Sequence, residues 1–407
     1  MIEHKISGFH NGSIHVTTSG TTYDVSQGAV VIASGYYMTG EELGAIYEDR
    51  GLMPLLHDNI YNIDGRLVGY KYGLHITGEH ERINIGADGE VSGEYAVYFE
   101  GDGSVAVNHG RITSPRGYGI YDSGSESRVY NSGTVIGSTA FADGSSGGTT
   151  FTNEAKGHIF GTFQGVYMGT ESTKFINHGL VHCVLDYAVS GGGGDDTIIN
   201  DGVIEGTIDL GDGKDVLDTR GGRIHGSIFG AAGDDILVTD NSDYKLIETA
   251  DGGADTVVST VSYKLSDNVE TLILRGRGNI NGTGTDGRET LIGNLGDNKL
   301  VGGAGFDTLV GGKGDDELIG GADARHADAA DTFVFSTGDG HDKVMDYTGF
   351  SDVLDFTNWQ GIDSLDDVDS HVHEIDHGLL IRLGHDSLLI SGYHKADFDG
   401  GHLIFKF

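Results

Sequence analysis

The sequence predicts an all-β fold, a solenoid in which a right-handed parallel β-helix continues into a tighter parallel β-roll. Three observations predict it. The 407 residues include 70 glycines but only 2 prolines, which indicates many turns and few interruptions of strand pairing. One motif recurs every 20 to 24 residues in the N-terminal half, and a nine-residue motif recurs after residue 191. Self-similarity at fixed periods is the signature of repeat architectures.

Residues 1–60 are expected to form an N-terminal cap with an insertion. The end of a solenoid exposes unpaired strand edges, which need a cover. Segment 36–60 interrupts the repeat and has helical spacing in EELGAIYEDRGLM. We expect this segment to cap the solenoid, with an oligomer contact or a substrate lid as alternatives.

Residues 61–230 are expected to form the parallel β-helix, because segments such as VAVNHGRI, RVYNSGTV and KFINHGLV occur once per coil. Equivalent residues of successive coils stack about 4.8 Å apart. The apolar residues after the glycine should therefore form one inward column: Val91, Ile112, Val135, Ile159, Val181, Ile204 and Ile224. The asparagines should form a ladder in which each side-chain amide bonds the next: Asn108, Asn131, Asn153, Asn177 and Asn200.

A second set of short motifs, including EYAVYF and GYGIYD, also occurs once per coil and predicts another face of the solenoid. Its aromatic residues have two interpretations: they pack the solenoid, or they form a platform on which sugars stack. We favour packing, because the residues belong to a structural repeat. The residues concerned are Tyr118, Tyr121, Tyr167 and Tyr187.

Residues 231–335 are expected to form the β-roll. The stretch VGGAGFDTLVGGKGDDELIGG fits the pattern G-G-x-G-x-D-x-apolar-x, so two units make an 18-residue coil. The glycines allow positive φ and let carbonyl oxygens converge, while the sixth residue adds a carboxylate. This all-oxygen set suits calcium at about 2.3–2.6 Å. The candidate ligating residues are Asp196, Asp215, Asp235, Asp255, Glu289, Asn298, Asp307, Asp316, Gly303, Gly305, Gly312 and Gly314.

Each calcium ion is expected between a unit and the next unit but one, because consecutive turns lie on opposite sides of the roll. This arrangement pairs Glu289 with Asp307 and Asn298 with Asp316. Asn298 and Glu289 replace the usual aspartate, and Leu210 and Ala250 replace a first glycine, so these sites are expected to bind more weakly or to stay empty. In the eighth position, Leu309 and Leu318 should point into the core.

From residue 191 to 407 the chain resembles the RTX proteins, secreted bacterial proteins with calcium-binding nonapeptide repeats. The tandem units at 302–310 and 311–319 carry the resemblance. It implies several calcium ions, export by the type I secretion machinery, and an extracellular or cell-surface location. It also implies that residues 336–407 form the C-terminal secretion region. The chain would then stay unfolded in calcium-poor cytosol and fold on calcium outside.

Other functions have weaker support. The formal net charge of −37 argues against nucleic acid as a partner, and no apolar stretch approaches the length of a membrane span. The single cysteine, Cys183, excludes an intrachain disulfide. The fragment HEIDH at 373–377 matches a zinc-protease motif, but its surroundings predict strand, turn and strand rather than the required helix.

The sequence therefore predicts a secreted, calcium-dependent structural or adhesive protein of the bacterial cell surface, surface layer or biofilm matrix. No catalytic residue is assigned. Acidic polysaccharide or a cell-surface glycan is a candidate partner, as is self-assembly. The alternative is an extracellular polysaccharide lyase or epimerase whose groove lies on the β-helix, since such sites need acids beside Lys or Arg.

Overall fold

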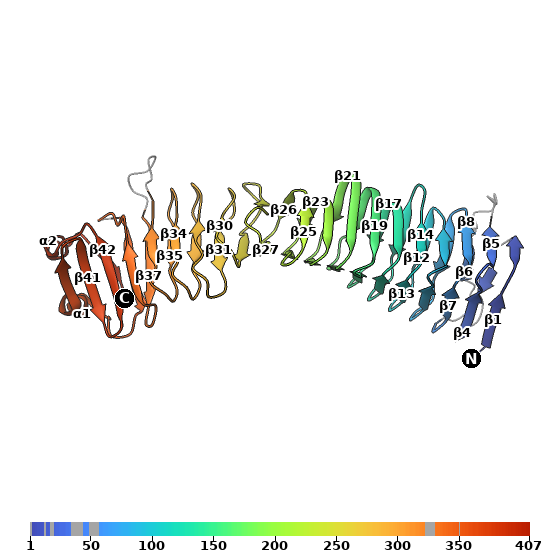
Figure 1. Cartoon of the computed structure of the whole chain (residues 1–407), viewed down its shortest axis with the longest axis horizontal. Coiled ribbons are helices and arrows are strands. Elements are labelled where there is room, and N and C mark those ends of the chain that lie inside the picture. The colour runs from blue at the N-terminus through green and yellow to red at the C-terminus, as the bar shows by residue number, and fades with distance from the viewer. Residues whose placement is uncertain are drawn as a thin grey trace. The chain divides into compact units, whose positions relative to one another are not determined.

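The computed structural model describes residues 2–11, 14–16, 20–33, 44–48, 57–321, 330–349 and 351–407. The chain divides into two compact units, Met1–Ala232 (unit 1) and Gly233–Phe407 (unit 2). Each is built from parallel strands stacked coil upon coil, as Figure 1 shows within each unit. The prediction of an all-β parallel solenoid is confirmed.

Unit 1 has two long parallel sheets, and each coil adds strands to both. The strands of the first sheet are β1 (Ile2–Ile6), β4 (Thr21–Val25), β7 (Ile60–Ile63), β10 (Arg82–Ile85), β13 (Val105–Asn108), β16 (Arg128–Asn131), β18 (Thr150–Asn153), β20 (Lys174–Asn177), β22 (Thr197–Asn200) and β24 (Val216–Asp218).

In each coil, the strands of the second sheet of unit 1 follow the turn that comes after the strand of the first sheet. Its strands are β2 (Phe9–Asn11), β3 (Ile14–Val16), β5 (Val30–Ala33), β6 (Gly44–Glu48), β8 (Arg66–Gly69), β9 (Tyr72–Ile76), β11 (Glu90–Ser92), β12 (Tyr95–Phe99), β14 (Arg111–Thr113), β15 (Tyr118–Asp122), β17 (Thr134–Asp143), β19 (His158–Tyr167), β21 (Leu180–Ser190), β23 (Val203–Asp212), β25 (Arg223–His225) and β26 (Ile228–Ala232).

The inward column predicted for unit 1 is confirmed. Val91, Ile112 and Val135 are at most 1% exposed and occupy paired positions in β11, β14 and β17. The remaining members of the column are also buried: Ile159, Val181, Ile204 and Ile224. These residues form the apolar core of unit 1 because each lies over its counterpart in the next coil.

The asparagine ladder is also confirmed. Successive asparagines are register partners, and the Nδ2 of each donates to the Oδ1 of the next over 2.7–2.8 Å. The ladder runs through Asn108, Asn131, Asn153, Asn177 and Asn200. All five are at most 1% exposed, so the ladder satisfies polar groups where water is excluded.

The helical spacing in segment 36–60 predicts a helix, but part of that segment forms a strand instead. Residues 44–48 form β6, a strand whose backbone pairs in parallel with β9. A strand forms here because pairing with the neighbouring coil supplies backbone hydrogen bonds. A local spacing pattern carries no information about such pairing. Residues 34–43 and 49–56 of the expected cap and insertion lie outside the described residues.

Unit 2 has two sheets on alternate sides of each coil. The first contains β27 (Ile236–Thr239), β29 (Thr256–Ser259), β31 (Thr271–Leu274), β33 (Thr290–Ile292), β35 (Thr308–Val310), β37 (Thr332–Ser336), β39 (Val353–Asn358) and β43 (Ile404–Lys406). The second contains β30 (Tyr263–Lys264), β32 (Gly282–Thr283), β34 (Lys299–Val301), β36 (Glu317–Ile319), β38 (His341–Val344), β40 (Val372–Ile375), β41 (Gly378–Leu383) and β42 (Asp386–Ser391). The short β28 (Leu246–Ile247) lies between β27 and β29 in sequence.

The 18-residue coil predicted for the repeats is confirmed by the register. Thr290 pairs with Thr308 in one sheet, and Lys299 pairs with Glu317 in the other. Leu309 and Leu318 are fully buried, as expected for the eighth position of the motif.

The C-terminal part of unit 2 departs from the parallel pattern. β40, β41 and β42 pair in antiparallel fashion, and two short helices follow the coils: α1 (Leu365–His371) and α2 (Lys395–Asp399). His373 and Glu374 lie in β40, which is a strand and not the helix that a zinc-protease motif requires. In the described part of the chain, no helix is both long and apolar enough to cross a membrane.

We predict that Asn153→Ala lowers the local stability of unit 1, because it removes one donor and one acceptor from the buried ladder. The free energy of opening of β16–β20 should fall by about 1–3 kcal/mol. Hydrogen exchange of peptides covering these strands measures it. The control is Asn84→Ala, which removes a half-buried asparagine bonded to Asn62 on the outer side of the coil. Equal effects of the two substitutions would contradict the role of the buried ladder.

Candidate metal sites

In unit 2, the sixth residue of each nine-residue motif lies immediately before a strand, where the chain turns into the sheet. Asp235, Asp255, Glu289 and Asp307 precede β27, β29, β33 and β35 of the first sheet. Asn298 and Asp316 precede β34 and β36 of the second sheet. Two rows of oxygen-bearing side chains therefore follow the two sheets.

Backbone hydrogen bonds connect each row. Glu289 N donates to Asp307 Oδ1 over 2.9 Å, and Asn298 N donates to Asp316 Oδ1 over 2.7 Å. Asp235 N and Asp255 Oδ1 make the equivalent bond at 2.8 Å. The structure therefore brings together the pairs that the sequence predicted, Glu289 with Asp307 and Asn298 with Asp316.

The second carboxylate oxygen of Asp307 and of Asp316 is the unusual feature of these sites. Each residue is only 1% exposed, and within the described part of the chain each Oδ2 is buried without a hydrogen-bond partner. A buried, ionised oxygen with no partner costs several kcal/mol, so buried charges are usually paired or bind a metal.

Backbone carbonyls approach the same oxygens. A Cβ built on Gly302 would lie 2.3 Å from Asp307 Oδ2 and 2.6 Å from the carbonyl oxygen of Gly320 in the next coil. A Cβ on Gly311 would lie 2.4 Å from Asp316 Oδ2. The first glycine of the motif therefore leaves open a space on which oxygens converge.

The following glycines have the positive φ that the sequence predicted: Gly303 (+128°), Gly305 (+134°), Gly312 (+90°) and Gly314 (+127°). At Gly305 a side chain is excluded on two grounds, because a Cβ would also lie 1.7 Å from the carbonyl oxygen of Gly287. These glycines thus bring the backbones of successive coils close together.

Glu289 and Asn298 replace the usual aspartate, and their side-chain oxygens accept hydrogen bonds within their own turns. The Glu289 carboxylate accepts from the backbone and the hydroxyl of Thr285. Asn298 Oδ1 accepts from Asn294 N over 2.7 Å, and its Nδ2 donates to Ile280 O. These local bonds occupy the oxygens that Asp307 and Asp316 leave available, which agrees with weaker binding at the two altered positions.

In unit 1, Asp196 and Asp215 repeat the arrangement. Thr173 N donates to Asp196 Oδ1, and Asp196 N donates to Asp215 Oδ1, both over 2.7 Å. Asp196 Oδ2 is buried and has no hydrogen-bond partner among the described residues. The row continues toward the N-terminus, since Thr173 Oγ1 donates to the buried Asp143, a residue that the sequence analysis did not select.

Four further members of the rows in unit 2 were not among the predicted ligands. Asp307 N donates to Asp331 Oδ1 over 2.9 Å. Asp316 N donates to Asp342 Oδ1, and Asp331 N donates to Asp352 Oδ1, both over 3.0 Å. Asp255 N donates to Glu270 Oε2 over 2.7 Å. A signal existed for Asp342, because TGDGHDKVM at 337–345 keeps glycine in the second and fourth positions, Asp in the sixth and Val in the eighth.

Burial raises the pKa of these carboxyls well above their ordinary value of 3.8. It raises the pKa of Asp316 to about 7, that of Asp342 to about 8 and that of Asp196 to about 8. The pKa of Asp307 is also raised by burial. A bound cation would offset this penalty by favouring the charged form.

The arrangement fits a hard cation with oxygen ligands. Carboxylate and carbonyl oxygens, supplied by flexible turns, are the ligands of Ca²⁺ in proteins. Asp307 and Asp316 would supply the carboxylates, and the glycine-rich turns would supply the carbonyls.

Comparison with known proteins identifies these repeats. Residues 283–318 match the family model of the RTX calcium-binding nonapeptide repeat in four copies. RTX nonapeptide repeats bind calcium, so the predicted ion is confirmed for this segment. Asp307 and Asp316 both lie within it.

Other comparisons add little. The crystal structure of the extracellular lipase LipA from Serratia marcescens aligns with 64% of this chain and 40% of its own, at 18% identity and a TM-score of 0.24. No curated protein matches the chain. The chain thus spans less than half of the lipase, and the repeat model alone identifies the family of the motif.

The raised pKa values predict that calcium binds more tightly as pH rises. Protonated Asp316 stabilises the calcium-free fold below pH 3.8, and this contribution is lost as pH rises through its folded pKa of about 7. Calcium must displace the proton at lower pH. The affinity for calcium should therefore rise by about tenfold between about pH 6 and about pH 8. Calorimetric titrations at the two pH values measure it, and Asp316→Asn should reduce the dependence. An affinity that does not change with pH would contradict the assignment.

Proposed function

We propose that this chain is a secreted, calcium-dependent structural or adhesive protein of the bacterial cell surface, surface layer or biofilm matrix. The RTX repeats support calcium binding, and such repeats are typical of proteins exported by type I secretion. We assign residues 336–407 to the secretion region. Calcium outside the cell would drive folding of the repeats.

The observation that carries this proposal is the pair of buried carboxylate oxygens, Asp307 Oδ2 and Asp316 Oδ2, which have no hydrogen-bond partner in the described structure. Without a cation, the fold must bury uncompensated charge or take up protons. With a cation, each site contributes about 1.4 kcal/mol when calcium exceeds its Kd by about tenfold. A few such sites equal a large part of the net stability of an ordinary domain.

We assign the remaining sites in the same way. Asp196 and Asp215 would add carboxylates in unit 1, and Asp235 and Asp255 would add them in unit 2. Glu289 and Asn298 would contribute weakly, because their side chains are bonded within their own turns. Gly303, Gly305, Gly312 and Gly314 would hold the turns in which carbonyls converge.

An exposed apolar patch in unit 1 supports the adhesive part of the proposal. It consists of Phe163 (51% exposed), Val184 (65%) and Leu185 (71%). The three residues lie where β19 and β21, which are paired neighbours, bulge out of register. Exposed apolar side chains on neighbouring coils are typical of a surface that binds a protein or a second copy of the chain.

A specific observation also keeps the polysaccharide enzyme as a second candidate. Two adjoining open pockets of about 500 Å³ and 370 Å³ share Ala155 on the surface of unit 1. The first contains Glu154 and Lys156, and the second contains Asp201 and Arg223. Acids beside cationic residues are the groups that lyases and epimerases use.

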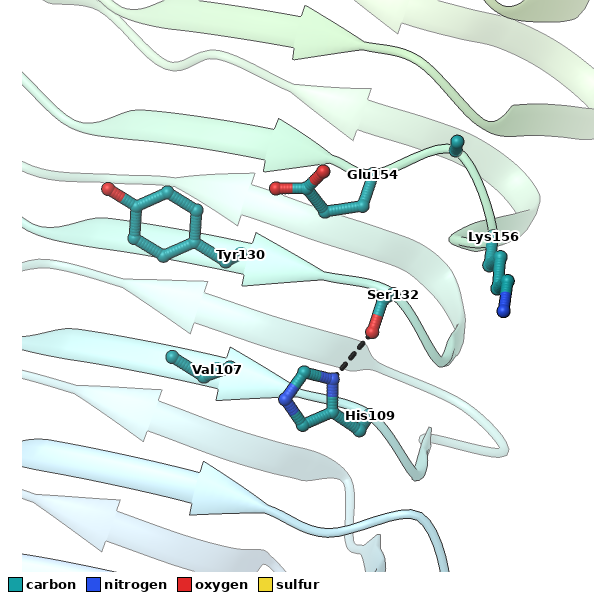
Figure 2. A pocket seen from close by; sticks show the side chains of 7 residues that line it. Val107, His109, Tyr130, Ser132, Glu154 and Lys156 are labelled. Atoms are coloured by element: carbon teal, nitrogen blue, oxygen red, sulfur yellow. Dashed lines mark hydrogen bonds between the residues drawn. The ribbon is translucent and has the colours of Figure 1, made fainter.

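Figure 2 shows the first pocket, where Tyr130 and Glu154 lie on successive coils above His109. His109 Nδ1 lies 2.6 Å from Ser132 Oγ. Tyrosines elsewhere on unit 1 contact one another: Tyr95 stacks on Tyr118 with ring centroids 5.1 Å apart. This stacking supports the packing interpretation for Tyr118, whereas Tyr130, which was not among the tyrosines selected from the sequence, would offer its ring to a sugar in the pocket.

We predict that removing calcium with a chelator abolishes β-structure in residues 230–407. The buried carboxylates would then lack a counterion. Circular dichroism records the loss, and hydrogen exchange assigns it to unit 2. The double variant Asp307→Asn/Asp316→Asn should need more calcium to fold. Spectra that do not change on chelation would rule out calcium-dependent folding.

Assembly and catalysis can be measured in one experiment. Protein refolded with calcium is mixed with alginate, pectin or acidic exopolysaccharide, and particle size and product release are recorded together. We expect large particles without products, and Leu185→Asp should reduce particle size. Phe229→Asp, which changes an apolar residue of unit 1 that is 37% exposed and outside the patch, is the control. Product release without assembly would favour the enzyme.

A further inference from the structure

Glu248 occupies a position in unit 2 that a solenoid normally gives to an apolar residue. It follows β28 directly, and exposure alternates along the chain: Leu246 is 0% exposed, Ile247 40% and Glu248 8%. Since side chains of an extended chain alternate between its two faces, Glu248 points to the same side as the core residue Leu246. Both of its carboxylate oxygens are buried.

Two further carboxylates lie beside Glu248. Asp235 and Asp255 are fully buried, and one oxygen from each of the three residues lies within 4.8 Å of the others. The aspartates come from the turns before β27 and β29, whereas Glu248 comes from the middle of the segment that connects these two strands. Backbone stacking explains the position of the aspartates, but it does not explain the inward glutamate.

Asp255 gives an independent indication of a ligand. Its Oδ1 accepts from Asp235 N over 2.8 Å, so the stacking of the turns already uses that oxygen. Its Oδ2 is buried and has no hydrogen-bond partner in the part of the chain that the structure describes. A buried oxygen of this kind within a group of three acids needs either a proton or a cation.

We propose that Glu248 joins Asp235 and Asp255 in binding one calcium ion, as a third carboxylate that the nonapeptide pattern does not supply. The choice of ion rests on the calcium-dependent function proposed above. Oxygens within 4.8 Å of one another can surround an ion whose bonds are about 2.3–2.6 Å long. The site lies outside residues 283–318, and Glu248 belongs to no nonapeptide position that the sequence analysis assigned.

The three carboxylates give this site a higher affinity for calcium than the other nonapeptide sites. A nonapeptide site combines one or two carboxylates with carbonyls, whereas this site has a formal ligand charge of −3. Affinity for calcium rises with the number of charged ligands. The Glu248 site therefore fills at a lower calcium concentration than the site of Asp316.

Calorimetric titration of the full chain with calcium tests the proposal. We expect one ion to bind in a tight class and the others more weakly. Glu248→Gln should remove the tight class by raising its Kd at least about tenfold. The matched control is Glu317→Gln, at an outward glutamate of β36 whose side chain is 38% exposed and pairs with Lys299. Glu317→Gln should leave both classes unchanged.

Two further variants distinguish a failure of the proposal from a failure of the nonapeptide assignment and from a failure to fold. Asp316→Asn should remove a weak ion and keep the tight class, so its failure to change binding would count against the nonapeptide assignment alone. If Glu248→Gln does not fold at any calcium concentration, Glu248→Asp keeps a carboxylate and should fold with an intermediate Kd. The proposal is overturned if Glu248→Gln retains the tight class, or if Glu248→Asp is no better than Glu248→Gln.

Discussion

Register between successive coils is the constraint on which the rest of the structure depends. Parallel pairing places each residue over its counterpart one coil away, so every inward polar residue becomes a member of a row. The residue type then decides how the row is satisfied. An amide has both a donor and an acceptor, and the asparagines from Asn108 to Asn200 donate to and accept from one another along the ladder. A carboxylate has only acceptors, so an aspartate row cannot satisfy itself.

The aspartate rows use two additional partners. One oxygen of each carboxylate accepts a backbone N–H from the preceding coil, as in the bond from Asn298 N to Asp316 Oδ1. The other oxygen of Asp307 and of Asp316 has no hydrogen-bond partner in the described structure, and a Cβ on Gly302 would meet both Asp307 Oδ2 and the carbonyl oxygen of Gly320. Both kinds of row stack buried polar side chains from coil to coil. The asparagine row pairs neutral amides, whereas the aspartate rows carry charge that a cation can balance.

The sequence was most informative where a residue type repeats in phase. The column from Val91 to Ile224, the asparagine ladder and the pairing of Asn298 with Asp316 all follow from spacing alone. Asp342 was missed because it lies 26 residues after Asp316, out of phase with the 18-residue coil. Glu248 could not be found, since it follows a two-residue strand whose inward side no periodicity defines. The strand at 44–48 was masked by helical spacing, because backbone pairing between coils overrides a local pattern.

The hydrogen bonds of the aspartate rows run in one direction, from each coil to the carboxylate of the next. Each coil therefore depends on its neighbour for one acceptor and shares with it the space for an ion. A chain of nearest-neighbour couplings behaves as a one-dimensional cooperative system. The steepness of its response to calcium then depends on the number of coils in the row. Adding or removing coils therefore changes this steepness without a change in the residues of any single site.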